Sequence, residues 1–272
     1  MTKLVLRETT DGVTTLTMNN PSKLNGWTQK MLAAVTDALK QAGEDDATRA
    51  VILTGADPYY CAGVNLGATI RPMHPAKLHA FIVEHNQALF ETFIRFPKPI
   101  LIAANGPAIG ACVTSATLCD AIIASERATF STPFATLGIT PEGCSSVMFP
   151  RLLGDEAAQR MLGPEAWKPT AAEALEIGLV QWVVPHEELM AEAQRIARGW
   201  VEDGAERTYR GDATREELER VNAEESRQLA DAFLSPAFLE GQLRFLWGKK
   251  KLRASALFLT ARLTHPLWSR LL

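Results

Sequence analysis

Short apolar runs alternate with polar, turn-forming stretches in the first half of the chain, and this pattern predicts strands separated by helices. Two strands, at 4–7 and 13–18, flank an Asp11-Gly12 pair, which is typical of a β-hairpin turn. Further strands are expected at 50–54, 100–104 and 121–125, with a short one near 128–130. Apolar residues at helical spacing predict helices over 28–42 and 78–96. Strands that alternate with helices in this way favour parallel pairing.

The second half of the chain is predicted to be mainly helical. Helices are expected over 146–153, 155–162, 171–177, 187–200 and 214–233, with one or two more between 235 and 271. A short strand is expected at 179–183. Because the composition shifts to charged helix near residue 200, we expect a core at 1–200 and a helical region at 201–272.

The composition of the chain argues against several classes of function. The chain has 272 residues, of which 47% are hydrophobic and 22% charged, enough apolar material for a sizeable core. The formal net charge of −3 gives no general attraction to nucleic acid, so no such partner is expected. No apolar run is long enough to span a membrane, and the first residues lack a signal-peptide pattern. The four scattered cysteines are typical of a reducing compartment, and we expect a cytoplasmic location.

The stretch 97–146 carries the candidate chemistry. The small pair Gly110-Ala111 opens a short apolar helix after a turn, so a ligand can approach backbone N–H groups there. Glu142 stands in a Thr-Pro-Glu-Gly turn between two apolar segments. We interpret the first feature as an oxyanion hole and the second as a general base. The alternative for Glu142, a structural carboxylate in the first turn of a helix, stays open at this point.

Five segments in order resemble the crotonase (enoyl-CoA hydratase/isomerase) superfamily over about residues 3–250. They read NNPSKLNG, CAGVNL, PKPILIAANGPAIGACVT, CDAIIASERATFSTPFATLGITPEG and TAAEALEIGLVQWVVP. Two further runs, TPEGCSS and RVNAEESRQL, resemble the peroxisomal-type Δ3,Δ2-enoyl-CoA isomerases within that superfamily.

This resemblance implies an α/β fold, the ClpP-like spiral of ββα units, with C-terminal helices that mediate a homotrimer or a dimer of trimers. It implies an acyl-CoA substrate whose thioester carbonyl sits between the N–H groups of Val64 and Ala111. No metal or other cofactor is implied, since CoA is part of the substrate. Residues 71–96 are expected to shape the acyl pocket. The positions matched to acyl-CoA binding are Ser22, Lys23, Leu24, Ala62, Gly63, Val64, Asn65, Leu66, Gly110, Ala111, Thr114 and Phe134.

The resemblance also bears on the acid–base chemistry. Hydratases of the superfamily use two glutamates, and the matching positions here hold Thr114 and Phe134, neither of which is a carboxylate. Glu142 matches the single base of the isomerases. Moving a double bond from C3 to C2 needs only one carboxylate that reaches both C2 and C4. The sequence therefore predicts a Δ3,Δ2-enoyl-CoA isomerase. A hydratase, a dienoyl-CoA isomerase, a thioester hydrolase and a non-catalytic acyl-CoA-binding protein of the same fold are the alternatives.

Other polar residues receive structural interpretations. Asp120 is expected to be a turn or capping residue, and Ser145 and Ser146 are expected to cap a helix. His74, His79 and His85 lack the spacing of a metal site. The Lys249–Lys251 run is interpreted as a solvated or oligomer-facing surface, with CoA phosphates or an anionic membrane as alternative contacts.

Overall fold

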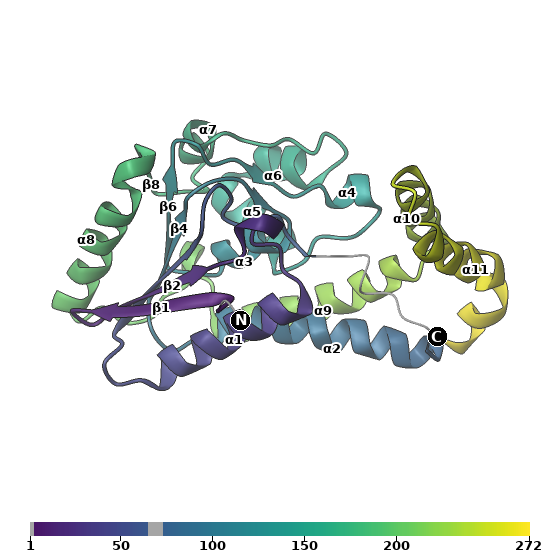
Figure 1. Ribbon diagram of the computed structural model, residues 1–272, viewed down its shortest axis with the longest axis horizontal. Coiled ribbons are helices and arrows are strands. Elements are labelled where there is room, and N and C mark those ends of the chain that lie inside the picture. Colours follow the sequence, from purple (N-terminus) through teal and green to yellow (C-terminus); the bar gives the residue numbers. More distant parts are fainter. Residues whose placement is uncertain (1–2, 65–72) are drawn as a thin grey trace.

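The computed structural model describes residues 3–64 and 73–272. Its main sheet has six strands and lies between α8 (Leu189–Glu202) and the remaining helices (Figure 1). The strands lie in the order β1-β2-β3-β4-β6-β8. Their bounds are β1 Val5–Thr10, β2 Val13–Met18, β3 Ala50–Gly55, β4 Ile100–Ala104, β6 Ala121–Ser125 and β8 Trp182–Val184. The first pair is antiparallel, and all later neighbours pair in parallel, as the alternation of strands and helices predicts. A separate parallel pair joins β5 (Ala108–Ile109) to β7 (Phe130–Ser131).

Helices follow the strands and fill the second half of the chain. Their bounds are α1 Gln29–Glu44, α2 Pro75–Ile94, α3 Ala111–Thr117, α4 Phe134–Leu137, α5 Ser145–Leu153, α6 Asp155–Leu162, α7 Ala171–Glu176, α8 Leu189–Glu202, α9 Arg215–Phe233, α10 Pro236–Gly248 and α11 Leu252–Trp268. A side-chain oxygen just before the helix accepts a backbone N–H of the first turn in α1, α7, α9 and α10, which fixes where these helices begin. No helix in the described ranges combines the length and the apolar character that crossing a membrane requires.

Two details differ from the sequence-based expectation. The strand β8 begins at Trp182 instead of residue 179, because the N–H groups of Leu179 and Val180 both donate to the carbonyl of Ala174 and close the end of α7. The short helix α4 and the two-residue strand β5 were not expected. Both are too short to leave a periodic pattern in the sequence.

Alternate residues of the central strands face two different layers. In β3, Ala50 and Ile52 pack with α8 on one side, whereas Val51 and Leu53 pack with α1, α2 and α3 on the other. Figure 1 shows α8 alone on its side of the sheet, with α1, α2 and α9 on the opposite side. The central parallel strands β3, β4 and β6 are therefore buried on both faces, as their continuous apolar runs indicate.

A second core lies at the end of α2 that is farther from the sheet. There Leu78 and Ile82 of α2 pack with Phe134 of α4, with the last turns of α9, and with α10 and α11. Helices α2 and α9 lie side by side and link the two cores (Figure 1). The predicted boundary near residue 200 falls within α8, and α9 contributes to both cores through Leu218 and Leu229.

Candidate active site

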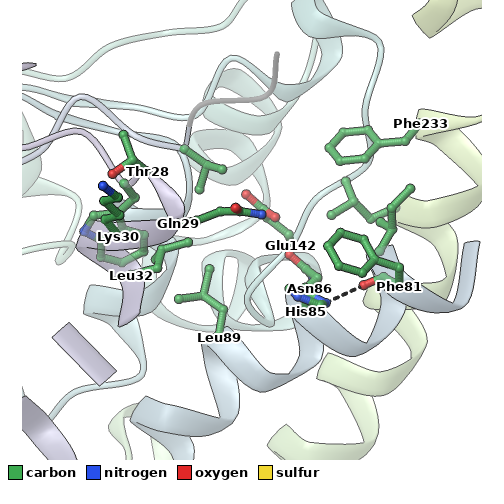
Figure 2. A pocket seen from close by; sticks show the side chains of 14 residues that line it. Thr28, Gln29, Lys30, Leu32, Phe81, His85, Asn86, Leu89, Glu142 and Phe233 are labelled. Atoms are coloured by element: carbon green, nitrogen blue, oxygen red, sulfur yellow. Dashed lines mark hydrogen bonds between the residues drawn. The ribbon is translucent and has the colours of Figure 1, made fainter. Parts of the chain in front are cut away.

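A cavity of about 430 Å³ lies between the start of α1 and the paired helices α2 and α9. Figure 2 shows polar side chains from the start of α1 on one side, aromatic side chains on the other, and the Glu142 carboxylate between them. Among the described residues, the cavity is therefore a predominantly apolar pocket with one acidic group in its wall, a form typical of small-molecule sites. Its lining residues are Trp27, Thr28, Gln29, Lys30, Leu32, Val64, Phe81, Ile82, His85, Asn86, Leu89, Glu142, Leu229 and Phe233.

The turn that carries Glu142 is pressed against two helices. Gly143 has a φ of +67°, and a Cβ atom at this position would lie 2.4 Å from a ring carbon of Phe90 and 2.6 Å from the hydroxyl of Thr114. Only glycine meets both demands, since it tolerates positive φ and leaves room for close packing. The Ser145 hydroxyl donates to the carbonyl oxygen of Glu142 at 2.8 Å. These contacts hold the backbone of the turn, and with it the attachment point of the Glu142 side chain, in one place.

Glu142 is a buried acid, with only 7% of its surface exposed. Its carboxylate accepts no hydrogen bond from any group in the described part of the chain. Burial, and after it the nearby Glu225 carboxylate, together raise the pKa of Glu142 from its ordinary value of 4.5 to about 8. A carboxylate that accepts no hydrogen bonds and lies in an apolar wall is more basic than an ordinary carboxylate. Abstraction of a carbon-bound proton requires such a base.

Two backbone segments meet beside this cavity. Cys61 donates its N–H to Pro107 at 3.3 Å and accepts the N–H of Ile109 at 3.0 Å, which aligns residues 61–64 with residues 107–111. A Cβ atom on Gly63 would lie 2.6 Å from the carbonyl oxygen of Ile109, so the two segments are in contact. The N–H groups of Val64 and Ala111 donate to no acceptor within the described residues.

Gly110 lies just before Ala111 and leaves space at this junction. Its φ is +69°, and a Cβ atom built there would meet nothing within 4 Å. Val64 lines the cavity, and Ala111 is the first residue of α3. The structure thus brings the two predicted N–H donors onto neighbouring segments with open space beside them.

The predicted CoA loop is connected to the same segments. Ser22 and Lys23 lie in an exposed 3-10 turn, Pro21–Lys23, and Leu24 follows with 37% of its surface exposed. The carbonyl of Leu24 accepts the N–H of Ala62 at 3.0 Å, so this loop continues onto the segment that ends at Val64. Asn65 and Leu66 lie outside the described residues.

Two predicted contact residues lie behind the cavity wall and do not line it. Thr114 is fully buried, and its hydroxyl donates to the carbonyl of Ala111 at 3.2 Å. Phe134 is 1% exposed and belongs to the second core. Contact between these residues and an acyl chain stays a prediction.

Most lining residues from α1, α2 and α9 were missed individually by sequence reasoning. The expected acyl-pocket region 71–96 does supply Phe81, His85 and Asn86. His85 Nδ1 lies 2.9 Å from the carbonyl oxygen of Phe81, and the Asn86 amide donates to Ser226 of α9 at 3.1 Å. The polar Asn86–Ser226 pair ties α2 to α9. No local sequence pattern predicts this contact, because the two residues lie 140 positions apart in the sequence.

Asp120 has a structural role, but it joins distant segments and caps no helix in the described chain, and the expectation that the serines cap a helix is wrong. The Asp120 carboxylate accepts the N–H groups of Ile100 at 2.7 Å and Thr208 at 2.7 Å and pairs with Arg207. The residue before α5 is Cys144, and no serine side chain caps this helix. Glu225 of α9 instead accepts the N–H groups of Cys144 and Ser146. Among the described residues, no three His, Cys, Asp or Glu side chains are grouped so that they could hold a metal ion.

Comparison with known proteins places this site in a family context. Residues 8–246 match the family model described as enoyl-CoA hydratase/isomerase. Rat enoyl-CoA delta isomerase 2 is 36% identical over 267 residues, which cover 92% of this chain and 65% of the rat protein. Mouse peroxisomal enoyl-CoA delta isomerase 3 is 39% identical over 67% of this chain and 57% of its own length. The chain thus spans about two thirds or less of the length of these relatives.

Solved structures agree with the sequence comparison. An enoyl-CoA hydratase/isomerase from Pseudoalteromonas atlantica superposes with a TM-score of 0.74 at 28% identity, covering 90% of this chain and 98% of that one. The predicted fold class is therefore confirmed, and so is the predicted superfamily.

Proposed function

Because this chain belongs to the enoyl-CoA hydratase/isomerase family, we propose that it is an enoyl-CoA isomerase that moves the C3 double bond of a 3-enoyl-CoA to the 2-trans position. The observation that carries this proposal is the buried carboxylate of Glu142 in the wall of the cavity. Thr114 and Phe134 occupy the positions of the two hydratase glutamates, and their side chains do not line the cavity. A site with one base and no second carboxylate among the described residues of its lining is suited to shifting a double bond.

The proposed reaction needs one proton acceptor and one anion site. The ionised Glu142 takes a proton from C2, and the electron pair of that C–H bond delocalises into the thioester to form a dienolate. The N–H groups of Val64 and Ala111 stabilise the enolate oxygen, and each such donor is worth roughly 3 kcal/mol of barrier. Protonated Glu142 then returns the proton at C4, and the double bond is left between C2 and C3. The reaction is balanced without water or a cofactor, since CoA belongs to the substrate.

The setting of the protein is also part of the proposal. We expect a homotrimer or a dimer of trimers, built through the C-terminal helices, and a cytoplasmic location. The four cysteines are all buried and unpaired, which fits a reducing compartment. The mouse relative is named as peroxisomal, so localisation of the tagged chain in cells distinguishes the two compartments.

A product assay tests the reaction type. Incubating the protein with 3-hexenoyl-CoA should raise the absorbance of a conjugated 2-enoyl thioester while the mass stays unchanged. Hydration adds one water to the mass, and thioester hydrolysis releases free CoA thiol, so mass spectrometry and a thiol reagent separate the alternatives. Tight binding of the CoA ester without turnover would instead favour a binding protein.

The raised pKa of Glu142 predicts the pH dependence of this reaction. The base acts only when ionised, and the pKa of Glu142 in the free protein is about 8. We therefore expect kcat/KM to fall about tenfold for each pH unit below 8 and to level off above it. Initial rates at low substrate concentration between pH 5.5 and 9.5 measure this acidic limb of the pH profile. A limb near pH 4.5 would show that the carboxylate is solvated in the working enzyme.

A further inference from the structure

Glu225 of α9 is a second buried carboxylate, and it holds the turn that follows Glu142. Its Oε2 accepts the N–H of Cys144 at 2.6 Å, and its Oε1 accepts the N–H of Ser146 at 2.8 Å. Only 2% of Glu225 is exposed. Within the described residues it forms no ion pair with Lys or Arg, so the N–H groups at the start of α5 are its stabilising partners.

We propose that Glu225 is a positioning residue for the Glu142 base: it fixes the turn that carries Glu142 and keeps a negative charge beside it. This inference rests on the proposed function, in which Glu142 is the base. Helix α9 then contributes, through Glu225, to the position and the basicity of Glu142.

The backbone of the turn shows why a partner is needed. Gly143 and Cys144 both have positive φ, +67° and +63°. This conformation is unfavourable for a residue with a side chain, such as Cys144. The short bond from the Cys144 N–H to Glu225 stabilises the strained residue two positions after Glu142. Without it, the turn can relax and move the Glu142 carboxylate within the cavity.

The two carboxylates differ in their donors, and this decides which one holds a proton. Burial raises the pKa of both, but the bonds from Ser146 and Cys144 counteract the rise at Glu225. Glu142 has no such donor in the part of the chain that the structure describes. Hydrogen bonds to a carboxylate favour its ionised form, so the proton resides on Glu142 and the charge on Glu225. That charge opposes ionisation of Glu142 and increases its basicity.

The other charged or titratable side chains near the pair come from three helices. Lys30 of α1 and His85 of α2 line the same cavity as Glu142. Arg220, Glu224 and Arg227 of α9 line a separate cavity of about 360 Å³ that Glu225 also borders. The shift at Glu142 arises first from burial and second from Glu225. Glu225 is therefore the side chain whose removal should move the titration of Glu142.

Three variants separate the charge of Glu225 from its contribution to the shape of the turn. Glu225→Gln removes the charge and keeps the size. Glu225→Asp keeps the charge but shortens the reach to the two N–H groups. Ser145→Ala is the matched control, because it removes a neutral hydrogen bond from the same turn. Circular dichroism checks the fold of each variant.

The readouts are the pH profile of kcat/KM with 3-hexenoyl-CoA and an infrared titration of the protonated Glu142 carboxyl band. The band is assigned by its loss in Glu142→Gln, alone and combined with Glu225→Gln. Because it needs no turnover, it tests Glu225 even if the wild type fails to isomerise the substrate, a result that would count against the proposed function alone.

We expect Glu225→Gln to move both titrations to lower pH and to lower kcat/KM on the plateau between about tenfold and about 10²-fold, the effect of a misplaced reacting group. Glu225→Asp and Ser145→Ala should lower the rate but leave the titration near that of the wild type. A Glu225→Gln titration that coincides with the wild type overturns the proposal. If Glu225→Gln does not fold, an Asp variant that titrates near pH 4.5 overturns it equally.

Discussion

Replacing Glu142 by Gln should lower kcat for isomerisation by about 10³-fold, within the range that a positioned general base contributes. Gln has nearly the size of Glu and fills the same place in the turn, but its amide cannot accept a proton from C2. The apolar wall and the N–H groups of Val64 and Ala111 remain, so substrate binding and KM should change little. Steady-state kinetics and calorimetric titration with a non-reactive acyl-CoA measure the two effects separately.

The same chemical change at an exposed position is the control for this result. Glu84 lies on the exposed side of α2, and Glu84→Gln should retain the wild-type rate. Full activity in Glu142→Gln would mean that another group is the base. Loss of binding together with loss of kcat would mean that Glu142 serves mainly to shape the pocket.

Local signals predicted most of the fold because they coincide with long-range packing. The Asp11-Gly12 turn requires positive φ at both residues, and both have it, at +51° and +80°. The apolar runs of β3, β4 and β6 are buried throughout, so the signal for a strand and its place in the sheet agree. The predicted strand starts before β8 does, because Leu179 and Val180 are buried without belonging to a strand.

The candidate site was predictable where it depends on a motif and not where it depends on packing. Glu142 and the N–H groups of Val64 and Ala111 follow from short segments that match the family. The apolar side of the cavity depends on α2 lying beside α9, and no local pattern encodes that contact. The start of α5 shows the same limit, because its stabilising carboxylate, Glu225, stands 81 positions after Cys144.

Glu142→Gln, which should remove activity, should also make the protein more stable than the wild type, by an amount that grows as the pH rises. The pKa of Glu142 is about 8 in the folded chain and 4.5 in an ordinary solvated glutamate. Between these values the folded state holds a proton that the unfolded state has lost. Since the unfolded state then binds fewer protons, the free energy of unfolding of the wild type falls by about 1.4 kcal/mol per pH unit in this window. Gln does not titrate, so the variant escapes this loss.

Denaturant unfolding at one-unit intervals from pH 5 to 9 measures the effect. The stability of Glu142→Gln relative to wild type should rise steadily from pH 5 to about pH 8, by about 4 kcal/mol over this range, and stay constant above it. Ser145→Ala, a neutral change in the same turn, should differ from the wild type by the same amount at every pH. A flat difference for Glu142→Gln would show that the carboxylate is already solvated in the folded state. A rising difference would mean that the folded chain gives up stability to keep one carboxylate out of water, which is the condition that makes Glu142 basic enough to abstract a proton from carbon.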